Sequence, residues 1–155
     1  MTIEPKMKQL SAFLVAGITV RTVNKDEERP ESAKLPGLWS RFYSEALAAE
    51  VPHAIAESPI YGVYHDYEAD FRARYSVTAG VAVSAPADGG EFETVQVPAG
   101  TYLVFEGKGA MPQIVAETWK SVWDYFQDNN HFKRAYTTDF ELYAGEDEVA
   151  IHIAV

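Results

Sequence analysis

The order of predicted elements occurs twice along this chain, and the repetition restricts the fold more than any other feature. In each half a strand is followed by a helix and then by two strands, which gives the order β-α-β-β twice. Trp39 in the first predicted helix matches Trp119 in the second. Tyr64 lies 25 residues after Trp39, and Tyr143 lies 24 residues after Trp119. The chain is therefore interpreted as an internally duplicated α+β protein.

A chain of 155 residues has the usual size of one domain. The stretch Ser84–Glu91 is rich in Pro, Gly and Asp, which is typical of an internal linker. We therefore predict a single domain over residues 1–155, with two pseudo-symmetric halves at about 8–84 and 92–155.

The individual elements follow from the spacing of apolar residues. Leu10–Val23 is apolar and β-branched and predicts the first strand, with a bulge at Gly17. Apolar residues recur at steps of three and four from Leu35 to Leu47, which predicts a helix that ends at Val51. A second helical pattern begins after Pro112. The other predicted strands are short apolar or alternating segments: Ile60–Tyr67, Tyr75–Val83, Phe92–Val97, Thr101–Glu106, Asp139–Tyr143 and Glu148–Val155.

The strand Asp139–Tyr143 carries an acidic side chain among aromatic ones. Side chains alternate along a strand, so Glu141 and Tyr143 share one face of the sheet. A carboxylate in such a strand is costly to bury unless a partner compensates its charge. In the alignment of the two halves Glu141 corresponds to Gly62, so only the second half has an acid at this position. The alternative is an edge-strand glutamate that faces water or is paired with an internal Lys or Arg.

Composition excludes several classes of function. With 13 Lys and Arg against 23 Asp and Glu, the net charge of −10 repels phosphate backbones, so we expect no direct nucleic-acid partner. The absence of Cys excludes disulfides and thiolate chemistry. The four His residues lack metal-ligand spacing, so we expect neither a metal nor a cofactor. No apolar run approaches membrane-spanning length and no signal peptide is recognised, so we expect a cytoplasmic protein without a membrane partner.

Three stretches occur together in a recognisable order. They are Tyr61–Glu68, Val97–Gly109 with the Trp-bearing helix after it, and Asp139–Tyr143. Over about Phe13–Val155 the chain resembles the GyrI-like, or effector-binding, domain of AraC-type and MerR-type multidrug-responsive regulators. The resemblance implies tandem β-α-β-β repeats that form a curved antiparallel sheet, with two main helices on its concave side around a ligand cleft.

This chain differs from the multidrug-responsive regulators in one respect. In the regulators the effector-binding domain is attached to a helix-turn-helix segment, and this chain has no residues left to build one. We therefore expect a stand-alone effector-binding domain, of the kind encoded on integron gene cassettes, and not direct transcriptional control by this chain.

The resemblance implies a glutamate at the base of an aromatic cleft that receives cationic, lipophilic compounds. By motif this glutamate is Glu141, and burial is expected to raise its pKa. The aromatic residues that helix phase or strand position assigns to the cleft are Trp39, Tyr64, Trp119, Tyr143 and, as a further candidate, Phe105. The alternative for the tryptophans is a core position on their helices, and for the tyrosines a cross-strand packing pair.

A carboxylate in a ring-lined cleft suits a large organic cation, because an ion pair is stronger at low dielectric and ring faces attract cations. We therefore predict a binding protein for cationic amphipathic molecules, linked to transcription regulation or drug response, with no catalytic residue. Two alternatives remain. One is a hydrolase of small electrophilic compounds, in which Glu141 activates water and Tyr64 or Tyr143 donates a proton. The other, implied by the resemblance, is a protein that binds DNA gyrase; a transcription regulator is a further candidate partner.

Overall fold

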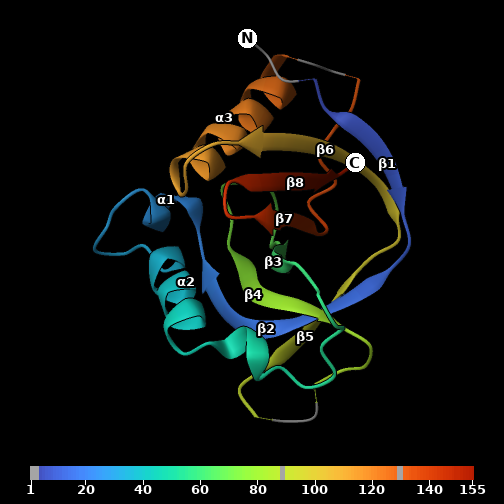
Figure 1. The fold of residues 1–155 in the computed structure, drawn as a ribbon. Helices are drawn as coiled ribbons and strands as arrows, with labels where there is room; N and C mark the ends of the chain where they lie inside the picture. Colours follow the sequence, from blue (N-terminus) through green and yellow to red (C-terminus); the bar gives the residue numbers. More distant parts are fainter. Residues whose placement is uncertain (1–3, 88–89, 129–130) are drawn as a thin grey trace.

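The computed structural model describes residues 4–87, 90–128 and 131–155, so part of the predicted linker, residues 88–89, lies outside it (Figure 1). The described residues form eight strands: β1 (Lys6–Leu10), β2 (Phe13–Thr22), β3 (Ile60–His65), β4 (Tyr75–Val83), β5 (Glu93–Val97), β6 (Gly100–Lys108), β7 (Asp139–Gly145) and β8 (Glu148–Ala154). The helices are α1 (Asn24–Glu27), α2 (Leu35–Ser44), the 3₁₀ helix η1 (Leu47–Ala49) and α3 (Gln113–Asp128). Among these helices, none has the length and apolar character needed to cross a bilayer.

All eight strands belong to one antiparallel sheet with the order β1-β6-β8-β7-β3-β4-β2-β5. From the central pair outwards, β7 is followed by β8 and β6, whereas β3 is followed by β4 and β2. Helix α2 connects β2 to β3 through the following loop, and α3 connects β6 to β7. The element order β-α-β-β therefore occurs on both sides of the central strand pair β3–β7. On this basis we propose that the chain consists of two duplicated halves.

The central pair β3–β7 decides which side chains meet. In its register Gly62 lies opposite Glu141, Ile60 opposite Tyr143, and Tyr64 opposite Asp139. Glu141 is thus in the middle of the sheet, and not on an edge strand.

The sheet buries apolar side chains on both faces. On one face, α2 packs Leu38 and Phe42 against β2 and β4, while α3 packs Val122 and Tyr125 against β6 and β8. On the opposite face, Phe140 contacts rings from both flanks of the sheet, with centroid distances of 5.5 Å to Phe13 and 5.6 Å to Tyr102. The sheet must curl to bring β2 and β6 to the same residue of β7. The predicted α+β fold with a curved antiparallel sheet is confirmed.

Three local predictions differ from the structure. Strand β1 was not expected; it pairs with β6 and forms one edge of the sheet. Helix α2 ends at Ser44 and not at Val51, because Ala46 takes a left-handed conformation with φ of 49° before η1 begins. The bulge at Gly17 is wrong, since β2 and β4 pair without interruption. A Cβ on Gly17 would lie 1.8 Å from the carbonyl oxygen of Ala79, so the strand needs glycine there for close backbone approach.

Candidate functional site

A cavity of about 870 Å³ lies between α2 and α3 on the helix-covered face. This volume is within the range of about 300–1,000 Å³ typical of small-molecule sites. The walls come from α2, the residues that enter β3, the start of α3, and the end of β7 with its turn. They consist of Leu35, Pro36, Trp39, Tyr43, Ser58, Pro59, Ile60, Tyr64, Met111, Pro112, Val115, Ala116, Trp119, Glu141, Tyr143, Ala144, Gly145 and Glu146. The structure therefore brings Glu141 together with four of the five predicted aromatic residues.

Glu141 is at the floor of this cavity and is 2% exposed. Its Oε2 accepts hydrogen bonds from the indole N–H of Trp119 at 2.7 Å and the hydroxyl of Tyr64 at 3.1 Å. Its Oε1 accepts one from the hydroxyl of Tyr143 at 2.9 Å. In the described part of the chain, no Lys or Arg forms an ion pair with this carboxylate. Both simpler alternatives, a solvent-exposed glutamate and one tied to an internal cation, are therefore wrong.

Burial dominates the electrostatics of the carboxylate. It raises the pKa of Glu141, and the hydrogen bonds from Trp119, Tyr143 and Tyr64 lower that pKa by less. Burial, and next the nearby Glu141 charge, also raise the pKa of the hydroxyls of Tyr64 and Tyr143, so both stay neutral donors. Among the described residues that line the cavity, two are acidic, Glu141 and Glu146, and none is Lys or Arg. The site therefore favours a positively charged occupant.

Two pairs of aromatic rings flank the carboxylate. Tyr64 and Trp119 have ring centroids 5.2 Å apart, and Trp39 and Tyr143 have centroids 5.4 Å apart in an edge-to-face arrangement. Trp39 also packs against the core beneath α2, and Trp119 packs against the core beneath α3. Each tryptophan therefore lines the cavity and also packs against the core, so the two alternatives predicted from the sequence are both realised.

Gly62 provides the space that the carboxylate occupies. A Cβ at this position would lie 2.6 Å from Oε1 of Glu141 and 2.9 Å from Cζ2 of Trp39. Opposite residues of adjacent strands project side by side from the same face, so the carboxylate and the indole fill the place of a Gly62 side chain. This packing explains why β3 has glycine where β7 has the acid: at this point of the strand pair there is room for a single side chain.

The structure does not place Phe105 in the cavity. Its ring is fully buried beneath α3, with centroids 5.5 Å from Tyr125 and 6.2 Å from Phe126. Strand alternation correctly directs Phe105 to the helix-covered face, but α3 covers that point of β6. Phe105 is a core residue, and this assignment is corrected.

Several cavity residues were not predicted. Tyr43 is four residues after Trp39, and Val115 is four residues before Trp119, so helix spacing could have identified both. Ser58 and Pro59 precede β3 in an irregular segment, where the sequence has no periodic signal. The structure also shows no group of three His, Asp or Glu side chains that could hold a metal ion within residues 4–87, 90–128 and 131–155.

Comparison with known proteins places this geometry in a family. The chain is similar to the integron cassette protein VCH_CASS2 from the mobile metagenome of Vibrio cholerae, with a TM-score of 0.84 and 38% identity over 98% of this chain and 95% of that one. It shares the fold of SAV2435, solved with tetraphenylphosphonium bound, with a TM-score of 0.78 and 22% identity over 99% of this chain and 94% of that one. YobU of Bacillus subtilis (strain 168), named as a candidate transcriptional regulator, is 32% identical over 133 residues, which cover 83% of this chain and 79% of YobU. The model of the Cass2 family matches residues 6–155, and the chain therefore belongs to this family of integron-associated effector binding proteins.

Proposed function

We propose that this protein captures lipophilic organic cations in the cavity between α2 and α3, with Glu141 as their counter-charge. The main support is the buried carboxylate, which has hydrogen-bond donors but no ion-pair partner in the described part of the chain. A buried charge without a partner is destabilising, and a bound cation would compensate it. The cation bound to SAV2435, a protein of the same fold, supports this ligand class.

The lining also indicates broad specificity. Each aromatic face that contacts a cation contributes about 0.5–2 kcal/mol, and buried apolar ligand surface contributes about 25 cal/mol per Å². The polar hydrogens of Tyr64, Trp119 and Tyr143 already point at Glu141. They impose no hydrogen-bond pattern on the ligand, so charge, size and apolar surface select it.

We further propose that this protein senses drug-like compounds by binding them, and that a separate regulatory protein recognises the ligand-bound form. The assignment to an effector-binding family and the similarity to YobU support a link to transcription. The net charge of −10 opposes direct contact with DNA. A regulatory partner would therefore carry the DNA-binding surface.

The hydrolytic alternative uses the same carboxylate. As a general base, Glu141 would take a proton from water. Burial raises the pKa of Glu141 overall, but both carboxylate oxygens already accept hydrogen bonds from the protein, and the described lining has no His or Lys as a second acid–base group, so capture agrees better with this geometry. Turnover of a labelled epoxide by wild type but not by Glu141→Gln would favour the enzyme.

The proposal is tested by calorimetric titration with tetraphenylphosphonium. We expect Glu141→Gln to bind about 10- to 100-fold more weakly, because the attraction between two unit charges about 6 Å apart is worth up to about 3 kcal/mol at an effective dielectric constant of about 20. Glu146→Gln is the matched control; it removes an exposed carboxylate from the same lining and should change affinity less than about threefold. Triphenylphosphine oxide, of similar shape but neutral, should bind more weakly to wild type. Equal binding by wild type and Glu141→Gln would refute the proposal.

A further inference from the structure

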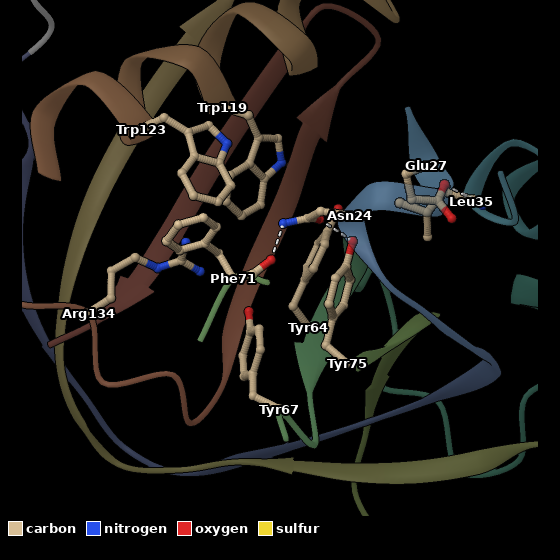
Figure 2. A pocket seen from close by; sticks show the side chains of 10 residues that line it. All are labelled: Asn24, Glu27, Leu35, Tyr64, Tyr67, Phe71, Tyr75, Trp119, Trp123 and Arg134. Atoms are coloured by element: carbon tan, nitrogen blue, oxygen red, sulfur yellow. Dashed lines mark hydrogen bonds between the residues drawn. The ribbon is translucent and has the colours of Figure 1, made fainter. Parts of the chain in front are cut away.

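A second, smaller cavity adjoins the first (Figure 2). Its volume is about 180 Å³, and a cavity of about 150 Å³ is large enough for a benzene ring. Leu35, Tyr64 and Trp119 line both cavities. The rings of Tyr64 and Trp119, with centroids 5.2 Å apart, thus form a wall shared with the Glu141 site.

Aromatic rings surround the small cavity. Tyr75 stacks on Tyr64 with centroids 5.7 Å apart and 28° between the ring planes. Phe71 meets the face of Trp123 edge-on at 5.2 Å. Figure 2 shows these rings, together with Tyr67, around the central space. Such walls suit a planar aromatic group, because offset and edge-to-face ring contacts are favourable.

Arg134 is the charged donor of this lining. Its side chain is 6% exposed, its Nη2 donates to Asp139 at 2.8 Å, and its guanidinium lies 5.4 Å from the ring centroid of Trp123. Its Nε–H is buried and has no hydrogen-bond partner among the described residues. Figure 2 shows the guanidinium end pointing inward beside Phe71. A buried donor without a partner is rare in native proteins and needs an acceptor.

The acceptors around this cavity are already engaged. Asp139 accepts from Arg134, from the hydroxyl of Tyr67 at 2.5 Å and from the backbone of Ala154 at 2.9 Å. Asn24 Oδ1 accepts from the hydroxyl of Tyr75 at 2.6 Å. Glu27 accepts from two backbone N–H groups at the start of α2, at 2.9 and 3.1 Å. The lining therefore offers a donor and requires an acceptor from its occupant.

The charges around the small cavity disfavour anionic ligands. Asp139 neutralises Arg134, and the whole chain carries a net charge of −10, which repels anions. We propose that the small cavity is a second binding site, which takes a single aromatic ring bearing a neutral carbonyl or amide oxygen, with Arg134 as the donor to that oxygen. Because Tyr64 and Trp119 also donate to Glu141, occupation of this site is coupled to binding in the larger cavity. The coupling rests on the proposed cation capture, whereas the second site itself does not.

The three tryptophans of the chain allow a direct test. Trp39 lines only the larger cavity, Trp123 only the smaller, and Trp119 both. Their indole N–H signals are followed by ¹⁵N-edited NMR during titration with benzamide. We expect saturable shifts of the Trp123 and Trp119 signals, with Trp39 unchanged. Ethylbenzene, which lacks the acceptor, should bind at least about tenfold more weakly, as for loss of a charge-assisted hydrogen bond.

Three results would each overturn a part of this proposal. An unchanged Trp123 signal at the solubility limit of benzamide would overturn the site. Equal binding of ethylbenzene would overturn the role of the acceptor, and tighter binding of benzoate than of benzamide would overturn the neutral ligand class.

Two variants connect the signal to the cavity. Arg134→Lys keeps a cation beside Asp139 but has no Nε–H in the position of the unpartnered donor, so it should reduce the preference for benzamide over ethylbenzene. Phe71→Ala removes a wall residue that is 41% exposed and tests the site if the Arg134 variant does not fold. It should weaken benzamide binding at least about threefold through lost ring contact. Tyr43→Ala is the matched control, since Tyr43 is exposed and lines only the larger cavity. An equal effect of Tyr43→Ala and Phe71→Ala would contradict the assignment.

The coupling is measured with both probes. Saturating benzamide should change the affinity for tetraphenylphosphonium, and saturating tetraphenylphosphonium should change the affinity for benzamide by the same factor. If tetraphenylphosphonium does not bind, cation capture fails while benzamide still tests the small cavity. If tetraphenylphosphonium binds and benzamide does not, the second site fails alone. If both bind without mutual effect, the coupling is refuted.

Discussion

Replacing Gly62 by Ala should damage the site although no charged or aromatic residue is replaced. The new Cβ would lie 2.6 Å from Oε1 of Glu141 and 2.9 Å from Cζ2 of Trp39, so both groups must move. Oε1 is the oxygen that accepts the 2.9 Å hydrogen bond from Tyr143. Movement of the carboxylate away from β3 would therefore disturb that bond and the position of the charge together.

The size of the effect follows from opposing contributions. Gly→Ala at a position without strain stabilises by about 0.4–1 kcal/mol through the unfolded state. Overpacking costs about 1–3 kcal/mol, and loss of a hydrogen bond to a charged group costs about 1.5–3 kcal/mol. If the shift weakens that bond only partly, the net loss should be about 1–3 kcal/mol. For a domain of this size, each 1 kcal/mol lowers the unfolding temperature by about 2–4 °C.

Urea denaturation and titration with tetraphenylphosphonium measure the two consequences. We expect a lower denaturation midpoint for Gly62→Ala and at least about tenfold weaker cation binding, the loss expected when a charged contact is displaced. Gly37→Ala is the control, because a Cβ on Gly37 in α2 meets no atom within 4 Å. It should stabilise the protein by about 0.5–1 kcal/mol and leave binding unchanged. Wild-type stability and affinity in Gly62→Ala would refute the interpretation of this glycine.

Four further predictions concern the buried charges. Only ionised Glu141 attracts a cation, so affinity for tetraphenylphosphonium should fall about tenfold per pH unit below the raised pKa of this group in the free protein; a pH-independent affinity would contradict this. Without ligand, the raised pKa of Glu141 means that its buried charge lowers stability at pH values above that pKa. The free energy of unfolding of wild type, relative to that of Glu141→Gln, should therefore increase as the pH falls through this pKa. Denaturation of both proteins across the pH range measures this difference. Trp119→Phe removes the 2.7 Å hydrogen bond and should raise the pKa of Glu141 by about one to two pH units, since such a bond contributes about 1.5–3 kcal/mol, and an unshifted pH profile of cation binding would exclude this role. Asp139→Asn leaves Arg134 buried without its counter-charge and should cost about 3–5 kcal/mol in urea denaturation, whereas Asp124→Asn, which breaks an exposed pair with Lys120, should cost less than about 1 kcal/mol.

Much of the fold was predictable, because local patterns specify its elements. Strand alternation and helical spacing are properties of neighbouring residues, so the order of most strands and of α2 and α3 could be predicted from the sequence. The resemblance to effector-binding domains is confirmed by the family match over residues 6–155. The duplicated halves stay a proposal, supported by the strand order.

The site was predictable in part for the same reason. Alternation along β7 correctly placed Glu141 and Tyr143 on one face, and helix phase directed Trp39 and Trp119 toward the same space. Phe105 shows the limit of this reasoning. Its face of the sheet was predicted correctly, but whether a residue on that face lines a cavity or lies beneath a helix depends on where α3 crosses β6.

Local patterns in the sequence specify the classes of element, the direction of their side chains and the position of Glu141 among the aromatic residues of β7, since these depend on neighbouring residues. The tertiary structure brings Gly62 against Glu141, because this contact depends on the register between β3 and β7. It also decided that Arg134 pairs with Asp139 beside a second cavity. Such contacts join segments whose separation along the chain carries no periodic signal, and packing of the whole domain selects them.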